Sequence, residues 1–177
     1  MEGTFKKETN TIGAHFSLRQ WGSYNIAIWD TAGEEKFCGL SAFYCRGAGA
    51  AIFAYDVTSE DSFHTLRARF KTLLQDADKD CLVVVVATKV DLLPSHARAV
   101  SQDDALILTR ELNSAPLEQL PYFETSSLNG QNVVKVFEYI FNQKLSHQNL
   151  EEQNRTVRSS TVDLRSSSRS SSSKCRC

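Results

Sequence analysis

Two short, continuous apolar runs constrain the fold of this chain more than any other feature. The runs are AAIFAYDV at residues 50–57 and CLVVVVAT at residues 81–88. Uninterrupted apolar runs of this length predict strands that are covered on both faces, as in parallel sheets. Between them, apolar residues recur at helical spacing from Phe63 to Leu74, after a Thr58-Ser59 pair that can cap a helix. The pattern therefore predicts strand, helix and strand in succession.

The flanking segments extend this alternation. Residues 14–21 and 23–30 read as two strands joined through Gly22-Ser23, a hairpin signal. Ser101 and Asp104 form a capping box that opens a helix through about Leu112. LPYFETSS predicts a further strand, and Asn132 caps a helix with an apolar face made of Val133, Val136, Phe137, Ile140, Phe141 and Leu145. We therefore expect an α/β fold with a doubly wound, mostly parallel sheet and helices on both faces.

The end of the chain differs in composition from the rest. Nine of the fifteen residues 159–173 are serine, which predicts disorder, so we expect one domain at 1–148 and a disordered tail at 149–177. From residue 154 onward the tail carries six Lys or Arg and one Asp, a formal charge of +5, which leaves −6 on residues 1–153 of a chain whose net charge is −1. The tail lacks aromatic residues that stack on bases, so we expect no nucleic-acid partner.

Cysteine usage and hydropathy indicate the cytoplasm. The five cysteines are irregularly spaced, which argues against a disulfide framework and against a zinc site. No apolar run approaches the roughly 18 residues that a membrane span needs. The first ten residues contain no hydrophobic signal region.

Three predicted strands end in polar motifs, where open α/β sheets bind ligands. The motifs are WDTAG (29–33), TKVD (88–91) and ETSS (124–127). A carboxylate at Asp91 can accept two hydrogen bonds from guanine N1 and N2, and the stem of Lys89 can cover the purine face. Each motif also has an ordinary interpretation: a strand that ends in a turn, a surface Lys-x-Asp pair, and a polar strand end.

The order and spacing of these motifs resemble those of the Ras-like small GTPases, and specifically the Rab family, from about Asn10 to Leu145. NTIG (10–13) resembles switch I, and WDTAGEEKF (29–37) resembles the Rab signature across switch II. Three further stretches are most similar to the atypical branch that holds members twenty and twenty-four, nearer to twenty: QWGSYNIAIWDTAG, YCRGA and KDCL.

The resemblance implies GTP or GDP as ligand, together with Mg²⁺. It assigns the metal to Thr11, with Asp30 acting through a water, and places the Gly33 amide on the γ-phosphate. The backbone amides of Ser126 and Ser127 would contact guanine O6. The nucleotide site as a whole would comprise Asp30, Thr31, Ala32, Gly33, Thr88, Lys89, Asp91, Ser126, Ser127 and Leu128. Bound GTP would order both switches, and hydrolysis would release them and change the affinity for effector proteins.

Several residues depart from the family pattern. Thr88 stands where asparagine is usual, which we expect to weaken binding more than it alters guanine preference, and Leu128 stands where lysine is typical. Glu34 occupies the position of the glutamine that orients the attacking water. A carboxylate there repels the γ-phosphate and cannot donate a hydrogen bond. We therefore expect slow or absent GTP hydrolysis, with Glu34 a doubtful catalytic residue.

The phosphate cradle is the largest departure. It requires Gly-x-x-x-x-Gly-Lys-Ser/Thr, and none of the eight glycines is followed by lysine. MEGTFKKETNTIG (1–13) resembles the end of the family's first helix running into switch I. We expect a chain that starts after the first strand and the P-loop, so that two strand edges lack backbone partners. Such a chain should be poorly stable and bind GTP weakly or not at all.

The chain ends in KCRC, with Cys175 and Cys177. They are either two cysteines without a role or, by the Rab resemblance, sites of double geranylgeranylation. The resemblance then implies Rab escort protein and GDP-dissociation inhibitor as partners, and a lipid anchor on the cytosolic face of endosomal or Golgi membranes. Two functional hypotheses remain: a membrane-traffic switch, or a nucleotide-independent interaction module that engages trafficking partners.

Overall fold

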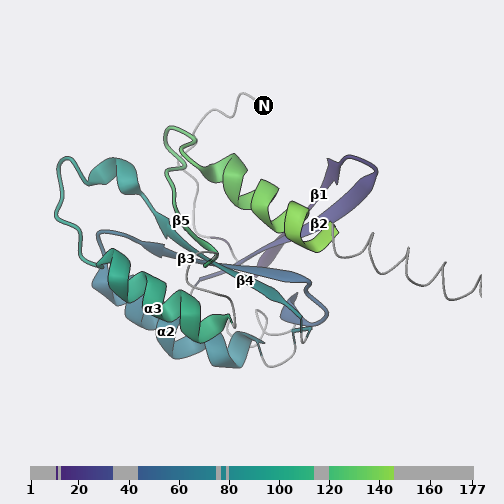
Figure 1. Ribbon diagram of the computed structural model, residues 1–177, viewed down its shortest axis with the longest axis horizontal. Coiled ribbons are helices and arrows are strands. Elements are labelled where there is room, and N and C mark those ends of the chain that lie inside the picture. Colours follow the sequence, from purple (N-terminus) through teal and green to yellow (C-terminus); the bar gives the residue numbers. More distant parts are fainter. Residues whose placement is uncertain are drawn as a thin grey trace, which may run out of the picture. The chain divides into compact units, whose positions relative to one another are not determined.

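The strands form two sheets in the computed structural model, which describes residues 11, 13–33, 44–74, 77–78, 80–113 and 120–145. β1 (Ala14–Trp21) and β2 (Tyr24–Thr31) pair as an antiparallel hairpin. β3 (Ala50–Asp56), β4 (Leu82–Thr88) and β5 (Tyr122–Glu124) form a parallel sheet in the order β3-β4-β5 (Figure 1). The predicted α/β class and parallel pairing are confirmed. Among the described strands, however, β2 and β3 are not hydrogen-bonded to each other, so the hairpin is a sheet of its own.

The hairpin turns at the predicted position. Trp21 pairs with Tyr24, and Gly22 between them has a φ of 57°, a left-handed conformation that L side chains rarely adopt. This turn fixes the register, which places Phe16 opposite Trp29.

The helices begin where the capping residues predict. α2 (Glu60–Leu74) follows Ser59, whose Oγ accepts the amide of Ser62 at 3.3 Å. α3 (Gln102–Leu112) follows Ser101, whose Oγ accepts the amide of Asp104 at 3.1 Å. Each cap satisfies an amide that has no partner within its own helix.

The central strand β4 is buried on both faces, which explains its continuous apolar run. Val83, Val85 and Ala87 join a core cluster with residues of α2 and α3, while Val84 and Val86 point to the opposite face. Figure 1 shows α2 and α3 on one side of this sheet and the helix at residues 133–145 on the other. That helix buries Val136, Ile140 and Phe141. The predicted placement of helices on both faces is therefore confirmed.

The end of β5 lies where the sequence predicts a polar strand end. The strand expected within LPYFETSS is β5 (Tyr122–Glu124), and its last residue, Glu124, opens the predicted ETSS motif. The chain leaves the sheet because Ser126 donates its amide to the carbonyl of Gln131 at 3.1 Å. Asn132 directly precedes the helix, as expected, but its side-chain amide donates to the carbonyl of Glu124 at 2.8 Å. It thus ties the start of the helix to the end of β5.

Candidate functional site

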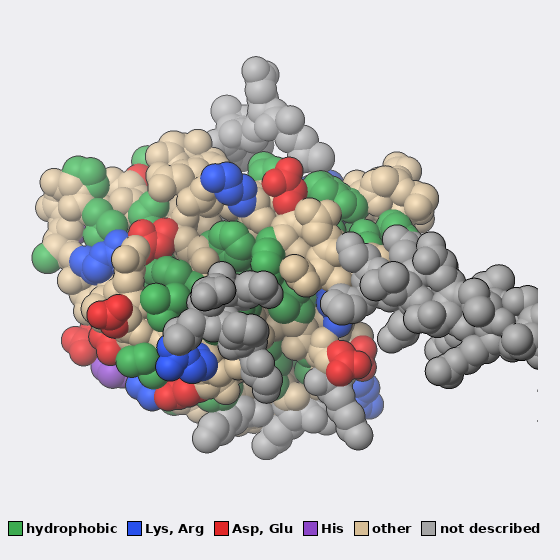
Figure 2. Space-filling view, viewed as in Figure 1, with side chains coloured by type: hydrophobic (Ala, Val, Ile, Leu, Met, Phe, Trp, Pro, Cys, Tyr) green, Lys and Arg blue, Asp and Glu red, His purple; other side chains and the backbone are tan. Residues whose placement is uncertain are grey.

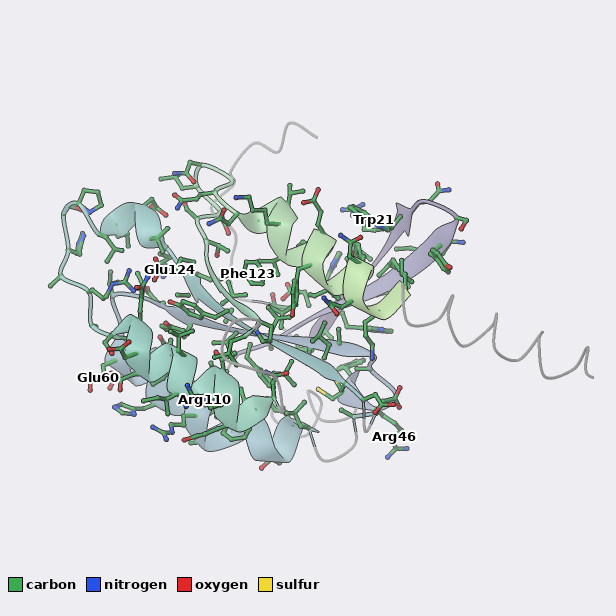
Figure 3. The ribbon with its side chains drawn as sticks, viewed as in Figure 1. Trp21, Arg46, Glu60, Arg110, Phe123 and Glu124 are labelled. Atoms are coloured by element: carbon green, nitrogen blue, oxygen red, sulfur yellow. The ribbon has the colours of Figure 1, made fainter. Side chains whose placement is uncertain are left out.

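The parallel sheet brings two of the three predicted polar motifs, TKVD and ETSS, to one edge, whereas WDTAG follows β2 in the hairpin. Asp56 pairs in register with Thr88, and Ala87 pairs with Glu124, so β3, β4 and β5 end side by side. Figure 3 labels Glu124 at this end of β5. The segments that follow these strands carry the residues expected to recognise guanine.

Asp91 and Ser126 meet at this edge. Asp91 lies in the single turn η2 (Val90–Leu92), and Ser126 follows β5. Ser126 is fully buried, and its Oγ donates to Oδ1 of Asp91 at 2.5 Å. The same Oγ accepts the amide of Leu128 at 3.1 Å, while Ser127 and Leu128 have exposed side chains. The structure therefore brings together the predicted base-binding residues of the second and third motifs.

The Ser126 amide donates to the carbonyl of Gln131 at 3.1 Å in the turn that follows β5. Its predicted contact with guanine O6 would require that bond to break, and the predicted contacts of the Ser126 and Ser127 amides with O6 stay predictions. The Ser126 hydroxyl donates to Asp91.

Thr88 and Lys89 connect the ends of β3 and β4. The hydroxyl of Thr88 donates to the carbonyl of Tyr55 at 2.8 Å, so threonine braces the neighbouring strand at a position where the family has asparagine. Lys89 has a φ of 62° and a ψ of 32°, the left-handed region. Its Nζ lies 2.7 Å from Oδ2 of Asp56, and its side chain is 59% exposed.

Asp56 is held from two sides. Its Oδ1 accepts the amide of Thr58 at 2.9 Å and the hydroxyl of Thr58 at 2.7 Å, while Oδ2 faces Lys89. Partial burial raises the pKa of Asp56, but the bonds from Lys89 and Thr58 outweigh it and hold the pKa below its ordinary value. The carboxylate is therefore charged at neutral pH.

A second charged cluster lies beside the end of β5. Glu124 accepts hydrogen bonds from Gln102 and from Tyr122, both at 2.9 Å, and from Nη2 of Arg98 at 3.2 Å. Nη1 of Arg98 lies 2.9 Å from the same carboxylate but is not aligned for a hydrogen bond, so the attraction there is between charges. Burial raises the pKa of Glu124, but these donors outweigh it and lower the pKa overall. Burial likewise raises the pKa of Tyr122.

The residues expected to hold Mg²⁺ and the γ-phosphate lie at the start of β1 and the end of β2. The hydroxyl of Thr11 donates to Oδ2 of Asp30 at 3.3 Å. Ala32 is buried, and its amide donates to the carbonyl of Gly13 at 2.8 Å. The carbonyl of Gly33 accepts a hydrogen bond from Nη1 of Arg69 at 3.2 Å. Thr31 is the last residue of β2. Glu34, Cys175 and Cys177 lie outside the described residues.

The donor chemistry of this pair fits Mg²⁺, which prefers oxygen ligands and keeps several waters or phosphate oxygens. Thr11 and Asp30 would supply one hydroxyl and one carboxylate. Over the described part of the chain, no three His, Cys, Asp or Glu side chains form a metal site by themselves. Any Mg²⁺ held here would therefore take its other ligands from water and a nucleotide.

An exposed aromatic surface lies on one face of the hairpin. We define it by Phe16, Leu18, Trp29 and Tyr44. The register places Phe16, Leu18 and Trp29 on the same face, where they are 47%, 56% and 47% exposed. The ring of Trp29 contacts those of Phe16 and Tyr44, with centroids 4.8 and 4.9 Å away. The other face of the hairpin contacts the body, with Trp21 5.0 Å from Phe141.

Sequence reasoning assigned no role to Asp56, Arg98 or the aromatic surface. Alternation within residues 14–31 carries a signal for the surface, because both faces of the hairpin contain large apolar residues. A hairpin that packs only one face against a core needs large apolar residues on that face alone. The ion pairs of Asp56 with Lys89 and of Arg98 with Glu124 have no comparable signal in the sequence, because the fold alone brings their partners together.

Comparison with protein families matches residues 1–146 to the Ras family. The chain is 37% identical to Ras-related protein Rab-20 of Homo sapiens over 173 aligned positions, which cover 80% of this chain and 74% of that protein. The chain belongs to the Rab branch of the Ras family. It is also 35% identical to Rab-20 of Mus musculus, with 89% of this chain and 82% of that protein covered. For GTP-binding protein ypt3 of Schizosaccharomyces pombe the identity is 35%, with 74% and 59% covered.

Membership of the Rab branch makes this a Rab-like small GTP-binding protein by descent. Rab proteins generally bind GTP or GDP with Mg²⁺, and they bind effectors, GDP-dissociation inhibitor and membranes. None of the helices described for this chain is long and apolar enough to cross a membrane.

Proposed function

We propose that this Rab-family chain is a membrane-traffic switch that binds guanine nucleotide weakly and hydrolyses GTP slowly. The observation that carries the proposal is the hydrogen bond between Ser126 and Asp91 at 2.5 Å. It fixes the Asp91 carboxylate at the edge where parallel sheets bind ligands, two residues along the chain from Lys89, whose side chain is 59% exposed. A carboxylate accepts several hydrogen bonds, so Asp91 can hold Ser126 and still accept from guanine N1 and N2.

The remaining parts of the proposal follow from the sequence. The phosphates would contact the Gly33 amide and a Mg²⁺ ion near Thr11 and Asp30, and Thr88 in place of the usual asparagine supports weak binding. Glu34 in the catalytic position supports slow hydrolysis. Residues 1–148 would form the GTPase domain, and residues 149–177 a basic tail geranylgeranylated at Cys175 and Cys177. Rab escort protein and GDP-dissociation inhibitor would handle this tail, on endosomal or Golgi membranes.

The nucleotide part is tested by titrating the purified chain with fluorescent GDP and GTP in the presence of Mg²⁺. We expect weak, saturable binding that GDP competes away and ATP does not. Asp91→Ala should abolish it, because the variant cannot accept from guanine N1 and N2. Tight binding with fast hydrolysis contradicts the proposed weakness, and no binding at millimolar nucleotide contradicts the switch.

The aromatic surface favours a second candidate, the nucleotide-independent interaction module. Exposed clusters of large apolar side chains mark sites that bind other proteins, and aromatic residues often dominate the binding energy there. Phe16, Leu18 and Trp29 are about half exposed, although the rings of Phe16 and Trp29 contact each other. This surface could bind partners whether or not a nucleotide is bound.

The two candidates are separated by measuring affinity for Rab escort protein and GDP-dissociation inhibitor, with and without added GDP. A switch requires that GDP changes these affinities, whereas a module requires that it does not. Trp29→Ala should weaken partner binding at least tenfold if the aromatic surface is the contact, the range typical of interface hot spots. Ile107→Ala is the matched control, because Ile107 is 48% exposed on α3.

A further inference from the structure

The end of β3 holds a carboxylate with two separate tasks. Asp56 is the last residue of β3 and pairs in register with Thr88, the residue before Lys89. One carboxylate oxygen accepts both bonds from Thr58, and the other lies 2.7 Å from Nζ of Lys89. Asp56 is therefore oriented by its own loop and is free to hold Lys89 with the second oxygen.

Lys89 is fixed at both ends of its side chain. Its backbone has a φ of 62°, and the next residue, Val90, donates its amide to the carbonyl of Thr125 at 3.2 Å. At the far end, the ammonium group is paired with Asp56, which is only 19% exposed. The side chain as a whole is 59% exposed, so a ligand can reach it although its ammonium group is paired.

A lysine stem that is held at both ends offers a flat ligand a fixed apolar surface. An unrestrained lysine samples many rotamers, and ordering it on a ligand opposes binding. An ion pair that orders the stem before the ligand binds removes this loss of conformational entropy from the binding step. A left-handed backbone at a residue other than glycine is also unfavourable, and such conformations cluster at binding sites.

We propose that Asp56 is a positioning residue of the nucleotide site, which pins the ammonium of Lys89 so that its stem forms a platform for the guanine ring. The inference rests on the proposed guanine site and adds a residue to it. Because the platform contacts the base, loss of Asp56 should weaken the binding of GMP and of GDP by the same factor. A merely structural Asp56 would instead act through Thr58 and the start of α2.

The test compares Asp56→Asn, Lys89→Met and the double variant by NMR titration of the full chain with GDP, and with GMP, in the presence of Mg²⁺. Asparagine keeps an oxygen for Thr58 but loses the ion pair, and methionine keeps an apolar stem without the charge. Glu111→Gln is the matched control, because it breaks an ion pair of 2.8 Å to Arg67 on an exposed surface between α2 and α3. Figure 2 shows basic and acidic side chains side by side over these two helices. Circular dichroism checks that each variant is folded.

We expect Asp56→Asn to weaken the binding of both nucleotides about five- to tenfold, because the Lys89 stem must then be ordered when the ligand binds. Glu111→Gln should leave them unchanged. In the Lys89→Met background, Asp56→Asn should have no further effect, because Asp56 acts only through Lys89. An equal loss in both backgrounds, or no loss in the single variant, overturns the proposal.

The failure of the guanine site is a distinguishable result. If the unmodified chain shows no shifts with either nucleotide, the proposed function fails, and the platform is then judged without ligand. Carbon relaxation should show that the Lys89 methylenes are more mobile in Asp56→Asn than in the unmodified chain. Their mobility in Glu111→Gln should equal that in the unmodified chain. Equal mobility in all three proteins overturns the proposal.

Discussion

Replacing Glu124 by glutamine removes the charge on which the cluster beside β5 depends. The carboxylate accepts from Arg98, Gln102 and Tyr122, and the side chains of Arg98 and Glu124 are 28% and 22% exposed. Hydrogen bonds to a charged group contribute about 1.5–3 kcal/mol each to stability. Solvent reduces the ion-pair part, and the amide oxygen of glutamine retains one acceptor. We therefore expect a loss of about 2 kcal/mol at pH 7, or a Tm lower by about 5 °C for a domain of this size.

The pH dependence of this loss identifies its cause. The pKa of Glu124 is lowered in the folded protein from an ordinary 4.5. Between the two values the unfolded chain binds more protons, so the stabilisation is fully present above pH 4.5 and disappears as the pH falls through the folded pKa. The difference in unfolding free energy between the two proteins should therefore shrink on acidification. Asp56 also has a lowered pKa, but it is present in both proteins and cancels in the difference.

Urea unfolding at pH 7, 5 and 4, followed by far-UV circular dichroism, measures this difference. Glu111→Gln serves as control, since the Arg67–Glu111 side chains are 47% and 42% exposed and such pairs contribute less than about 1 kcal/mol. The reasoning is refuted if both variants lose the same stability at pH 7. It is also refuted if the loss in Glu124→Gln is independent of pH.

Three further perturbations test the core and the site. Leu108→Ala removes a fully buried side chain of the core cluster and should lower the unfolding free energy by about 3 kcal/mol, measured by urea unfolding. Ser126→Ala leaves Asp91 without its hydroxyl partner, and should weaken GDP binding about tenfold in the NMR titration. Burial raises the pKa of Cys81 to about 11, so mass spectrometry should show that iodoacetamide alkylates it far more slowly at pH 8 than in the urea-unfolded chain.

Local signals predicted most of the fold. The run at residues 81–88 predicts a strand buried on both faces, and β4 has this environment because helices cover both sides. The capping box at Ser101 and Asp104 predicts the first residue of α3, since the hydroxyl and the amide that it joins lie within one turn. The TKVD and ETSS motifs likewise meet at one edge, because the parallel strands β4 and β5 in register end together.

Contacts between segments that are distant in the sequence could not be predicted. Glu124 belongs to the predicted ETSS motif, but its partners Arg98 and Gln102 lie 26 and 22 residues away in the chain. The turn after β5 was not predicted, because it contains hydrogen bonds of Ser126 to Gln131 and to Asp91. Both depend on tertiary contacts that no local pattern contains.

Three side chains expected to bind nucleotide or Mg²⁺ already have a partner within the protein. Asp91 holds Ser126, Lys89 holds Asp56, and Thr11 holds Asp30. A ligand that displaced these partners would gain little, because one hydrogen bond would replace another. A ligand that used the remaining lone pairs of Asp91 and the exposed stem of Lys89 would meet groups that are already oriented. Any affinity of this site therefore depends on leaving these internal pairs intact, and each of the variants Ser126→Ala and Asp56→Asn removes one of them.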